Sequence, residues 1–212
     1  TNDPLSTTRS YFAGNYRSSF GSYDVTEGFL ETVVPVANGL DLNAAARLTD
    51  YSTSGTVMTW KLGVTYSPID DITFRATRSR DIRAPNLAEL FQAGASNTST
   101  APDPFRGNVS TTFFTITQGN LELEPEEADT LGLGIVLKPR FLPGFQAAVD
   151  YYDIVTAGAI PTVDAQTLIN QCFAGNAPLC SQISRNPAGA ISQIIVQPIN
   201  LARQIARGID FE

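Results

Sequence analysis

Apolar and polar residues alternate along several stretches of the chain, as they do in β-strands that have one apolar and one polar face. Residues 40–48 show the pattern most clearly, because leucine or alanine occupies every even position while Asp41, Asn43 and Arg47 occupy odd positions. Alternation or a composition rich in β-forming residues predicts about seven antiparallel strands, at residues 24–36, 40–48, 59–66, 72–78, 131–137, 145–154 and 202–212. The chain is therefore predicted to be all-β.

The predicted connections between these strands differ greatly in length. Short turns are expected at residues 37–39, 68–71 and 139–144, and the first of them contains the strong hairpin signal Asn38-Gly39. Long loops are expected at about 79–128 and 156–199, and residues 1–23 form a loop before the first strand. Up-and-down strands with short turns at one end and long loops at the other are typical of outer-membrane β-barrels.

The two long connections contain elements of their own. Residues 164–184 are predicted to include a short helix, with Asp164 as a candidate N-cap. Residues 110–117 suit an extra strand, in which Phe113 and Phe114 are candidates either for contact with a ligand or for packing of the loop. Other ligand contacts are expected in the two long loops, without assignment to particular residues.

The alternating pattern fits two architectures that differ in where the apolar face points. In a soluble sandwich the apolar face forms the core, whereas in a transmembrane barrel it meets lipid and the polar face lines a wet lumen. The candidate lumen-facing residues are Asp41, Asn43, Arg47, Lys61, Arg75 and Asp150. Alternation alone leaves both architectures open.

The composition excludes several classes of function. The chain has 212 residues, a net charge of −7 and no histidine, so catalytic triads and histidine metal sites are absent. Lysine and arginine do not cluster, which argues against nucleic-acid binding. The carboxylates of residues 122–129 lack the spacing of a glycosidase pair or a calcium loop and suit a solvated rim. We expect neither an enzyme nor a resident cofactor or metal.

The two cysteines, Cys172 and Cys180, lie in a stretch that contains Gly, Asn and Pro. This spacing and the turn-forming residues allow a disulfide that closes a short loop, which would form in an oxidising compartment. Two free thiols are the alternative.

One stretch carries a more specific signal. The sequence TFRATRSRDIRAPNLAELF, residues 73–91, resembles an element of the TonB-dependent outer-membrane receptors in which a barrel strand runs into a loop. The matching residues are Arg83, Ala84, Pro85, Asn86, Leu87, Glu89, Leu90 and Phe91. Further segments resemble the same family in the same order, at residues 40–52, 120–135, 145–154 and 206–212.

The resemblance implies part of a transmembrane β-barrel in the outer membrane of a Gram-negative bacterium. Members of this family have an N-terminal plug domain and a barrel of about 22 strands, so the chain is expected to be a middle-to-late piece of a longer protein. The implied activity is energy-coupled import of a scarce nutrient such as a ferric siderophore, cobalamin or an oligosaccharide. The implied partners are outer-membrane lipid, the plug, the remaining strands, the TonB complex and the small-molecule nutrient. The rival hypothesis is a secreted or surface β-sandwich that acts as a binding or adhesion module.

The resemblance also suggests roles for particular residues. Pro85 marks the end of a strand, because it lacks a ladder donor and restricts the residue before it. Asn86 is expected to cap a short turn together with Glu89. We interpret this element as structural, fixing the loop at the extracellular rim near Arg80, Asp81 and Arg83. The cations of the polar face are expected to contact the plug or a ligand.

Overall fold

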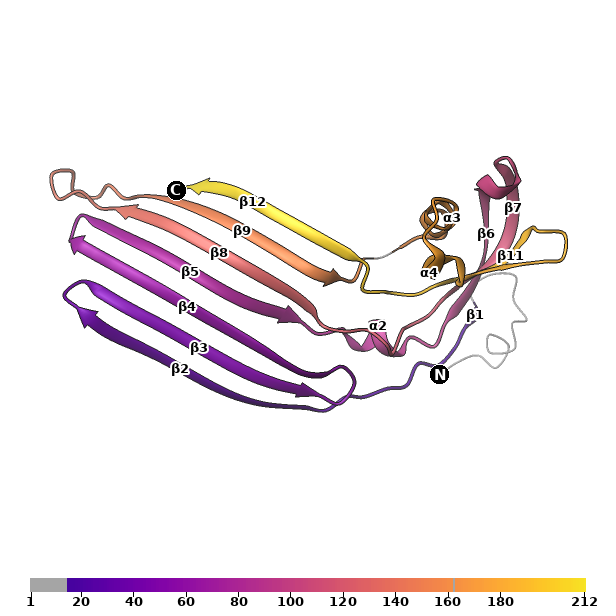
Figure 1. Cartoon of the computed structure of the whole chain (residues 1–212), viewed down its shortest axis with the longest axis horizontal. Coiled ribbons are helices and arrows are strands. Elements are labelled where there is room, and N and C mark those ends of the chain that lie inside the picture. Colours follow the sequence, from indigo (N-terminus) through magenta and orange to yellow (C-terminus); the bar gives the residue numbers. More distant parts are fainter. Residues whose placement is uncertain (1–14, 162) are drawn as a thin grey trace. The chain divides into compact units, whose positions relative to one another are not determined.

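The computed structural model describes residues 15–161 and 163–212, which form two compact units (Figure 1). We call the first the sheet unit; it consists of Tyr23–Ala84, Glu124–Ala159 and Asn200–Glu212. We call the second the loop unit; it consists of the described residues up to 22, Pro85–Leu123 and Ile160–Ile199. The two long connections predicted from the sequence therefore fold into a unit of their own.

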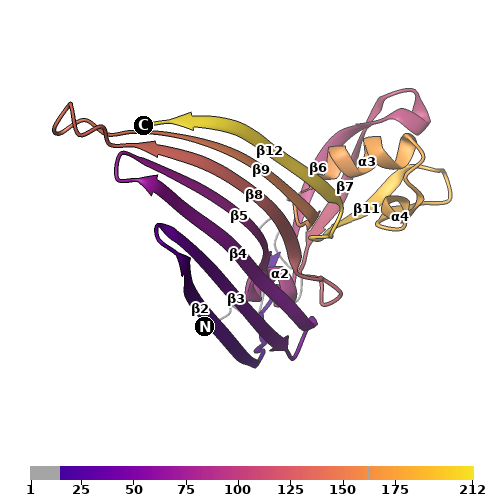
Figure 2. The ribbon, with the colours of Figure 1, turned by 60° about the vertical axis from the view of Figure 1, so that its left-hand side comes forward.

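The sheet unit is one antiparallel sheet of seven strands, in the order β12-β9-β8-β5-β4-β3-β2. Figure 2 shows the strands side by side from β2 to β12. Their bounds are β2 Val25–Ala37, β3 Leu40–Tyr51, β4 Gly55–Ile69, β5 Ile72–Arg83, β8 Glu126–Leu137, β9 Ala147–Ala159 and β12 Ala202–Phe211. All seven predicted strands are present, and the prediction of an all-β, antiparallel, up-and-down architecture is confirmed. Among the described residues the sheet remains open, with β2 and β12 at its edges.

The strands are longer than the alternating pattern indicated. The first long loop was predicted to span about residues 79–128. In the structure β5 continues to Arg83 and β8 already begins at Glu126. The added residues pair in register, Arg80 with Asp129 and Arg83 with Glu126. Cross-strand ion pairs extend the ladder here, beyond the end of the alternating apolar pattern. The connections therefore span residues 84–125 and 160–201.

The three predicted short turns lie at one end of the sheet, and the short turn between β3 and β4, at residues 52–54, lies at the other end. The first hairpin turns at Asn38-Gly39, where Gly39 has φ 72°. A Cβ on Gly39 would lie 2.2 Å from the Ser67 carbonyl oxygen. The Gly39 carbonyl in turn accepts a hydrogen bond of 2.7 Å from the Ser67 amide. Only glycine fits this turn without strain, both because of its positive φ and because of the close backbone approach.

The apolar face of the sheet unit is exposed rather than buried. Leu48 and Leu62 are each 56% exposed, and Ile209 is 57% exposed. A soluble sandwich would bury these side chains in its core. The β-sandwich hypothesis is therefore wrong, because the face that it needs as a core is open.

The loop unit contains a second sheet, in the order β1-β6-β7-β11-β10. The strands are β1 Asn15–Tyr16, β6 Ala95–Asp103, β7 Val109–Thr117, β10 Ile183–Arg185 and β11 Ile191–Val196. β11 pairs with β7 in parallel, although the two strands are far apart in sequence. The predicted strand at 110–117 corresponds to β7, whereas β1, β6, β10 and β11 were not predicted.

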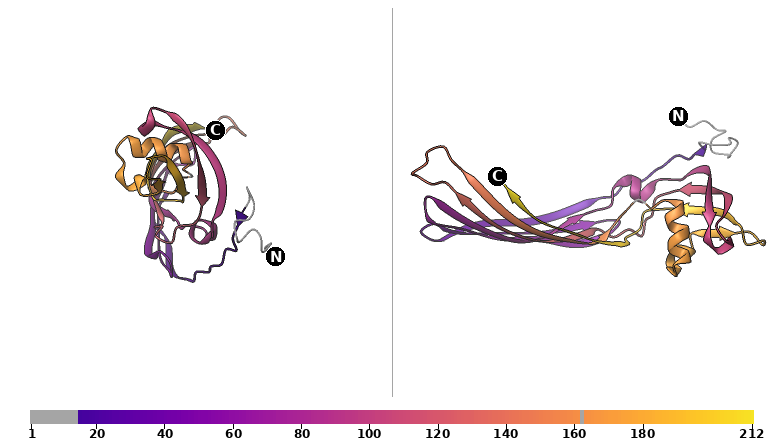
Figure 3. Two further views of the ribbon diagram at one scale, coloured as in Figure 1. Left: turned by 90° about the vertical axis from the view of Figure 1, so that its right-hand side faces the viewer. Right: turned by 90° about the horizontal axis from the view of Figure 1, so that it is seen from above.

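Short helices complete the loop unit: α2 Leu87–Phe91, η1 Pro104–Arg106, α3 Ala165–Phe173 and α4 Ala177–Cys180. The predicted helix within 164–184 is thus confirmed, and the Asp164 side chain accepts a hydrogen bond of 2.9 Å from the Thr167 amide as its N-cap. α3 lies against β6 and β11 (Figure 3). No helix in the described part of the chain is both long enough and apolar enough to cross a membrane.

A hydrophobic core fills the space between the helices and the second sheet. It consists of Ala101, Phe113, Val163, Leu168, Ile169, Leu179, Ile191 and Ile194. Ile169 and Ile194 are completely buried. The loop unit is therefore held together in the manner of a small globular domain.

Candidate functional site

The strand register places the predicted polar residues on one face of the sheet unit. Asp41, Thr65, Arg75, Gly134 and Asp150 are successive register partners across five strands. Asn43, Lys61 and Arg47 lie on the same face, in the rows above. All six candidates thus share one surface, which we call the polar face. That this face lines a lumen stays a prediction.

A bidentate ion pair lies at the centre of this row. The Arg75 Nε donates to Asp150 Oδ1 at 2.8 Å, and Nη2 donates to Asp150 Oδ2. Gly134 lies between the two residues, and a Cβ there would be 2.1 Å from Asp150 Oδ1 and 2.6 Å from Arg75 Nε. Glycine is therefore required at position 134, because any larger side chain would fill the space in which Arg75 and Asp150 meet.

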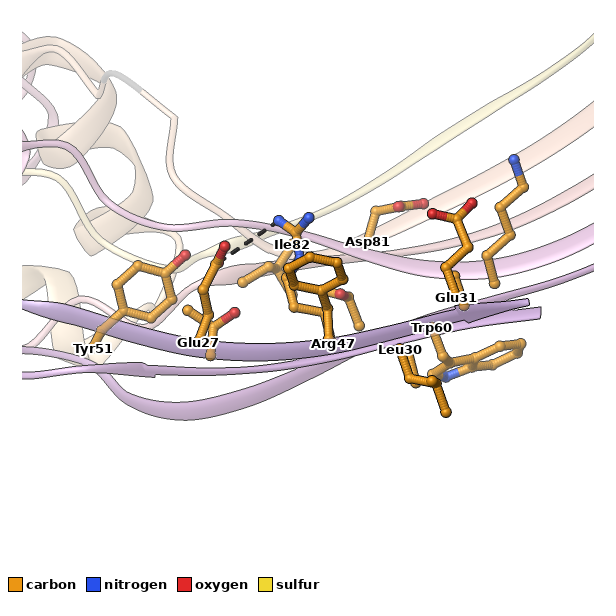
Figure 4. A pocket seen from close by; sticks show the side chains of 14 residues that line it. Glu27, Leu30, Glu31, Arg47, Tyr51, Trp60, Asp81 and Ile82 are labelled. Carbon is orange, nitrogen blue, oxygen red and sulfur yellow. Dashed lines mark ion pairs between the residues drawn. The ribbon is translucent and has the colours of Figure 1, made fainter.

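A second cluster of charges forms a concavity nearer to the long connections. This hollow has a volume of about 380 Å³ and is lined from β2, β3, β4 and β5 (Figure 4). Its charged residues are Glu27, Glu31, Arg47, Lys61 and Asp81. Figure 4 shows Glu27, Glu31 and Arg47 on the side of the sheet opposite Leu30 and Trp60. We call this hollow the upper concavity.

The contacts within the upper concavity are loose. Arg47 Nη1 lies 3.7 Å from Glu27 Oε2, and both side chains are about half exposed. The Arg47 guanidinium also lies over the Phe29 ring, 5.8 Å from its centroid. Exposed pairs of this kind contribute about 0–1 kcal/mol, so these side chains can rearrange around a partner at little cost. The sequence identified Arg47 and Lys61 but missed Glu27 and Glu31, although their even spacing in a predicted strand was a usable signal.

The motif that carried the family resemblance has a local structural role. The Asn86 side chain accepts hydrogen bonds of 2.9 Å from the Ala88 and Glu89 amides, and Glu89 accepts one of 2.8 Å from the Asn86 amide. This capping box begins α2, as predicted. Leu90 is buried, as is Pro85, whereas Leu87 is half exposed. Phe91 packs against Gly21, since a Cβ there would meet the Phe91 ring at 2.1 Å.

Arg83, the first of the matching residues of this motif, still pairs within the sheet as the last residue of β5. Its Nε and Nη2 donate to the two carboxylate oxygens of Glu126 at 2.9 and 2.7 Å. Arg80 and Asp81, which were expected beside it at the rim, lie on opposite faces of β5, because they are consecutive in a strand. The position of these residues relative to a membrane stays a prediction.

The two phenylalanines suggested as ligand contacts differ in their surroundings. Phe113 is 3% exposed and belongs to the core of the loop unit. Phe114 is 57% exposed on the opposite side of β7. Phe113 is therefore a packing residue, which corrects its candidacy as a ligand contact, while Phe114 presents its ring to solvent. Cys172 and Cys180 are joined in a disulfide with a Cα–Cα distance of 4.9 Å, linking α3 to α4.

The loop unit also contains a buried ion pair that the sequence did not indicate. Asp103 is fully buried, and Arg185 donates to its carboxylate from Nη1 at 2.5 Å and from Nη2 at 3.0 Å. Arg185 also lies over the Phe105 ring, 4.9 Å from its centroid. The hydrogen bonds from Arg185 lower the pKa of the Asp103 carboxyl below its ordinary value. The pair fixes the end of β6, where η1 begins, to β10 within the loop unit.

A smaller hollow of about 200 Å³ lies within the loop unit, between α2, the end of β7 and residues 196–198. Gln118 and Gln197 both line it, and Gln118 Nε2 donates to Gln197 Oε1 at 3.3 Å. Its lining is largely neutral. Within the described ranges, no group of three or more His, Cys, Asp or Glu side chains is placed to hold a metal ion.

Comparison with known proteins gives consistent results. A family model described as TonB dependent receptor-like, beta-barrel, matches residues 1–212. Curated protein sequences contain no significant match to this chain. The siderophore receptor PirA from Acinetobacter baumannii matches with a TM-score of 0.63 and 19% identity, over 89% of this chain and 25% of its own.

Two further solved structures are similar to the chain. A variant of the ferric enterobactin receptor PfeA from Pseudomonas aeruginosa, in complex with enterobactin, gives a TM-score of 0.65 and 18% identity over 89% of this chain and 24% of that one. A double mutant of the Serratia marcescens hemophore receptor HasR, in complex with its hemophore and heme, gives a TM-score of 0.60 and 14% identity. This match covers 89% of this chain and 31% of that one. The chain thus spans about a quarter to a third of these structures, and at such identities they show the fold alone.

Proposed function

Because this chain belongs to the TonB-dependent receptor-like β-barrel family, we propose that it forms part of an energy-coupled outer-membrane receptor that imports a scarce nutrient. The sheet unit is one sector of the barrel wall, and the loop unit is built from extracellular loops. The observation that carries the proposal is the sheet itself, whose exposed leucine-bearing face suits lipid while its charged face suits a wet lumen.

The chemistry of the polar face supports contact with a removable plug. The upper concavity combines three carboxylates with two cations, and the ion pair between Arg47 and Glu27 is long and exposed. Loose, hydrated charges bind a partner surface without a large desolvation cost and release it again. We propose that these side chains contact the plug domain of the complete receptor, which the TonB complex of the inner membrane displaces during import.

The loop unit supplies surfaces for nutrient capture. Phe114 is exposed, and the hollow beside Gln118 offers amide groups in a mostly neutral setting. Aromatic faces and a few placed polar groups are the usual means of holding a small molecule. We propose a ferric siderophore as the nutrient, a choice supported by the names of the siderophore receptors that share the fold. The proposed activity makes and breaks no covalent bond.

The proposal is tested by iron uptake in a Gram-negative host that lacks its own siderophore receptors. The complete receptor is expressed there, and uptake of radiolabelled iron is measured from catecholate siderophores, hydroxamate siderophores and heme, with cobalamin and oligosaccharides tested separately. We expect uptake from at least one ferric siderophore that stops when the TonB complex is deleted. Uptake of only a non-iron substrate would overturn the substrate class, and uptake independent of TonB would overturn the energy coupling.

A further inference from the structure

One face of the second sheet, in the loop unit, carries mainly hydroxyl side chains and no charge. The two sides of this sheet differ, because Phe113 is buried in the core whereas Phe114, the next residue of β7, is 57% exposed. We call the side that carries Phe114 the hydroxyl platform. We propose that the hydroxyl platform is a docking surface for a neutral polysaccharide chain of the medium. This inference rests on the proposed function in one respect, because it requires the loop unit to lie outside the cell.

The strand register gives the members of the hydroxyl platform. Residues of a strand alternate between two faces, so the even positions of β7 share the side of Phe114. In β6, Thr98 pairs with Phe114 and Thr100 pairs with Thr112, which extends the same face. Five of the eight even positions carry a hydroxyl group, and none carries a charge. The eight are Ser96, Thr98, Thr100, Pro102, Ser110, Thr112, Phe114 and Ile116.

The hydroxyl platform continues over two further strands, which lie beside β7 (Figure 1). Gln193 in β11 is the parallel partner of Phe114, and Ser184 in β10 is the antiparallel partner of Gln193. Thr98, Phe114, Gln193 and Ser184 therefore form one uncharged row across four strands. At the usual spacing between strands this row is about 14 Å long. A row of this length spans several units of a sugar chain.

The hydroxyl platform is accessible within the loop unit. Thr100, Thr112 and Ser184 are exposed, while Thr98 and Gln193 are half-buried. Helix α3 lies on the other side of the sheet, where it packs into the core. The hydroxyls of Thr100 and Thr112 lie 3.0 Å apart and share one hydrogen bond, in which either can be the donor. One hydroxyl hydrogen and lone pairs of both oxygens therefore remain for a ligand.

The chemistry of this face selects a neutral ligand that is rich in hydroxyl groups. Each hydroxyl can both donate and accept, so a row of them can bind the hydroxyls of a sugar in either direction. The ring of Phe114 offers an apolar surface to the C–H groups of a sugar ring. The members named above include no charged side chain that could neutralise a charged polymer, and the net charge of −7 repels an anionic one. A neutral polysaccharide meets all of these conditions.

The open shape of the hydroxyl platform favours a chain over a single sugar. A small molecule is usually held in a concave pocket that buries most of its surface. On one side of a sheet, an extended chain can instead contact several hydroxyls at once, so that individually weak hydrogen bonds act together. Thr117, which lines the hollow beside Gln118, lies on the opposite side of β7 from Phe114, so the hollow and the hydroxyl platform are separate surfaces. Because the loop unit is extracellular under the proposed function, we commit to a polysaccharide of the medium.

The docking surface is tested on the complete receptor in detergent, by biolayer interferometry on immobilised polysaccharides. The neutral probes are dextran, amylose and laminarin, and the anionic probe is alginate. We expect binding to at least one neutral glucan and none to alginate. Soluble fragments of the bound glucan should compete, whereas glucose should not. Binding to none of the neutral probes, or equal binding to alginate, would overturn the proposal, and neither result depends on the folding of a variant.

Two glutamate substitutions in β7 test the assignment to this face. Thr112→Glu places a carboxylate on the hydroxyl platform, and Val109→Glu places the same charge at an exposed position of opposite parity. We expect about tenfold weaker glucan binding for Thr112→Glu, because the carboxylate must lose water against the sugar, and no change for Val109→Glu. Phe114→Ser should also weaken binding, because it removes the ring. Equal losses in the two glutamate variants would show that the glucan binds elsewhere.

The same samples separate this inference from its rivals. Self-association of the receptor that is lost in Thr112→Glu, without glucan binding, would show that a second copy occupies the hydroxyl platform. Binding only to the surface polysaccharide of the expression host would overturn the external source. Siderophore binding of the unmodified receptor is measured alongside. A receptor that binds siderophore but no glucan refutes only this inference, whereas one that binds glucan but no siderophore refutes only the proposed nutrient.

Discussion

Both units are built on a β-sheet, but the loop unit buries its large apolar side chains whereas the sheet unit exposes them. In the loop unit Ile194 and Ile169 are fully buried in a core between a sheet and two helices. In the sheet unit Leu62 and Ile209 are exposed, and the buried apolar side chains are small, at Ala148 and Ala159. The comparison shows that alternation alone does not specify a core. What specifies it is whether a second layer lies over the apolar face.

The largest expected effect tests the core of the loop unit. Ile194→Ala leaves a cavity in a fully buried site and should destabilise the loop unit by about 2–5 kcal/mol. Ile209→Ala truncates a side chain of the same kind on the exposed face of the sheet unit and should have a much smaller effect. Proteolysis of the loops in the reconstituted receptor measures both. Equal effects would mean that the two apolar faces do not differ as described.

A somewhat smaller effect is expected for the buried ion pair of the loop unit. Asp103→Asn weakens charge-assisted hydrogen bonds and should cost about 1.5–3 kcal/mol. The pKa of Asp103 is lowered in the folded state, so its stabilisation is complete above its ordinary pKa and is lost as the pH falls through the folded-state value. Pepsin cleavage of the loops should therefore become faster as the pH falls below the ordinary pKa of Asp103. The increase in cleavage rate with falling pH should be smaller in Asp103→Asn.

The Asp164 cap serves as an internal check on that experiment. The hydrogen bonds from Thr167 lower the pKa of Asp164, so this residue contributes acid sensitivity in the same direction. Asp103→Asn should thus reduce the acid sensitivity without abolishing it. An unchanged pH profile in this variant would show that the pair between Asp103 and Arg185 does not stabilise the loop unit.

The polar face of the sheet unit offers a comparison of two glycines in one strand. Gly134→Ala would push a Cβ to 2.1 Å from Asp150 Oδ1 and should destabilise the sheet by about 1–3 kcal/mol by displacing the pair with Arg75. A Cβ on Gly132 would meet no atom within 4 Å, so Gly132→Ala should stabilise by about 0.4–1 kcal/mol. Urea unfolding of the reconstituted receptor measures both changes. Changes of the same sign would contradict the role assigned to Gly134.

The smallest expected effect concerns the cap of α2. Asn86→Ala removes the acceptor for two amides and should cost about 1 kcal/mol, which would appear as faster hydrogen exchange at Ala88 and Glu89. Glu89→Gln retains the capping geometry and should change exchange little. Protection factors that are equal in both variants would show that the loop packing, rather than the cap, holds this helix.

The sequence predicted the sheet unit well because most of its strands carry a two-residue period. The prediction failed at the strand ends, where Arg80 with Asp129 and Arg83 with Glu126 continue the ladder through charge. In the loop unit it identified β7 and the helix α3 but missed β6 and β11. β6 has the sequence ASNTSTAPD, in which polar residues occupy both faces, and the parallel pairing of β11 with β7 depends on distant residues.

The candidate site was also predicted only in part, because the sequence pattern gives the face on which a residue lies but not its contacts with distant strands. Alternation correctly grouped Asp41, Arg75 and Asp150, because a shared face follows from position parity once strands are in register. The concavity around Glu27 depends on the pairing of β2 with β3 and on the curvature of several strands, which no single segment encodes. The pair between Asp103 and Arg185 joins residues 82 positions apart and leaves no local pattern.

The most direct test of the central claim is a nitroxide scan of residues 40–48 in the complete, lipid-reconstituted receptor. Each position is labelled in turn, and its collision rates with oxygen and with a water-soluble relaxant are compared. The account predicts access from lipid at residues 40, 42, 44, 46 and 48, and access from water at residues 41, 43 and 47. If the even positions were shielded from both relaxants, the leucine-bearing face would be a protein core, and the barrel-wall account would be contradicted.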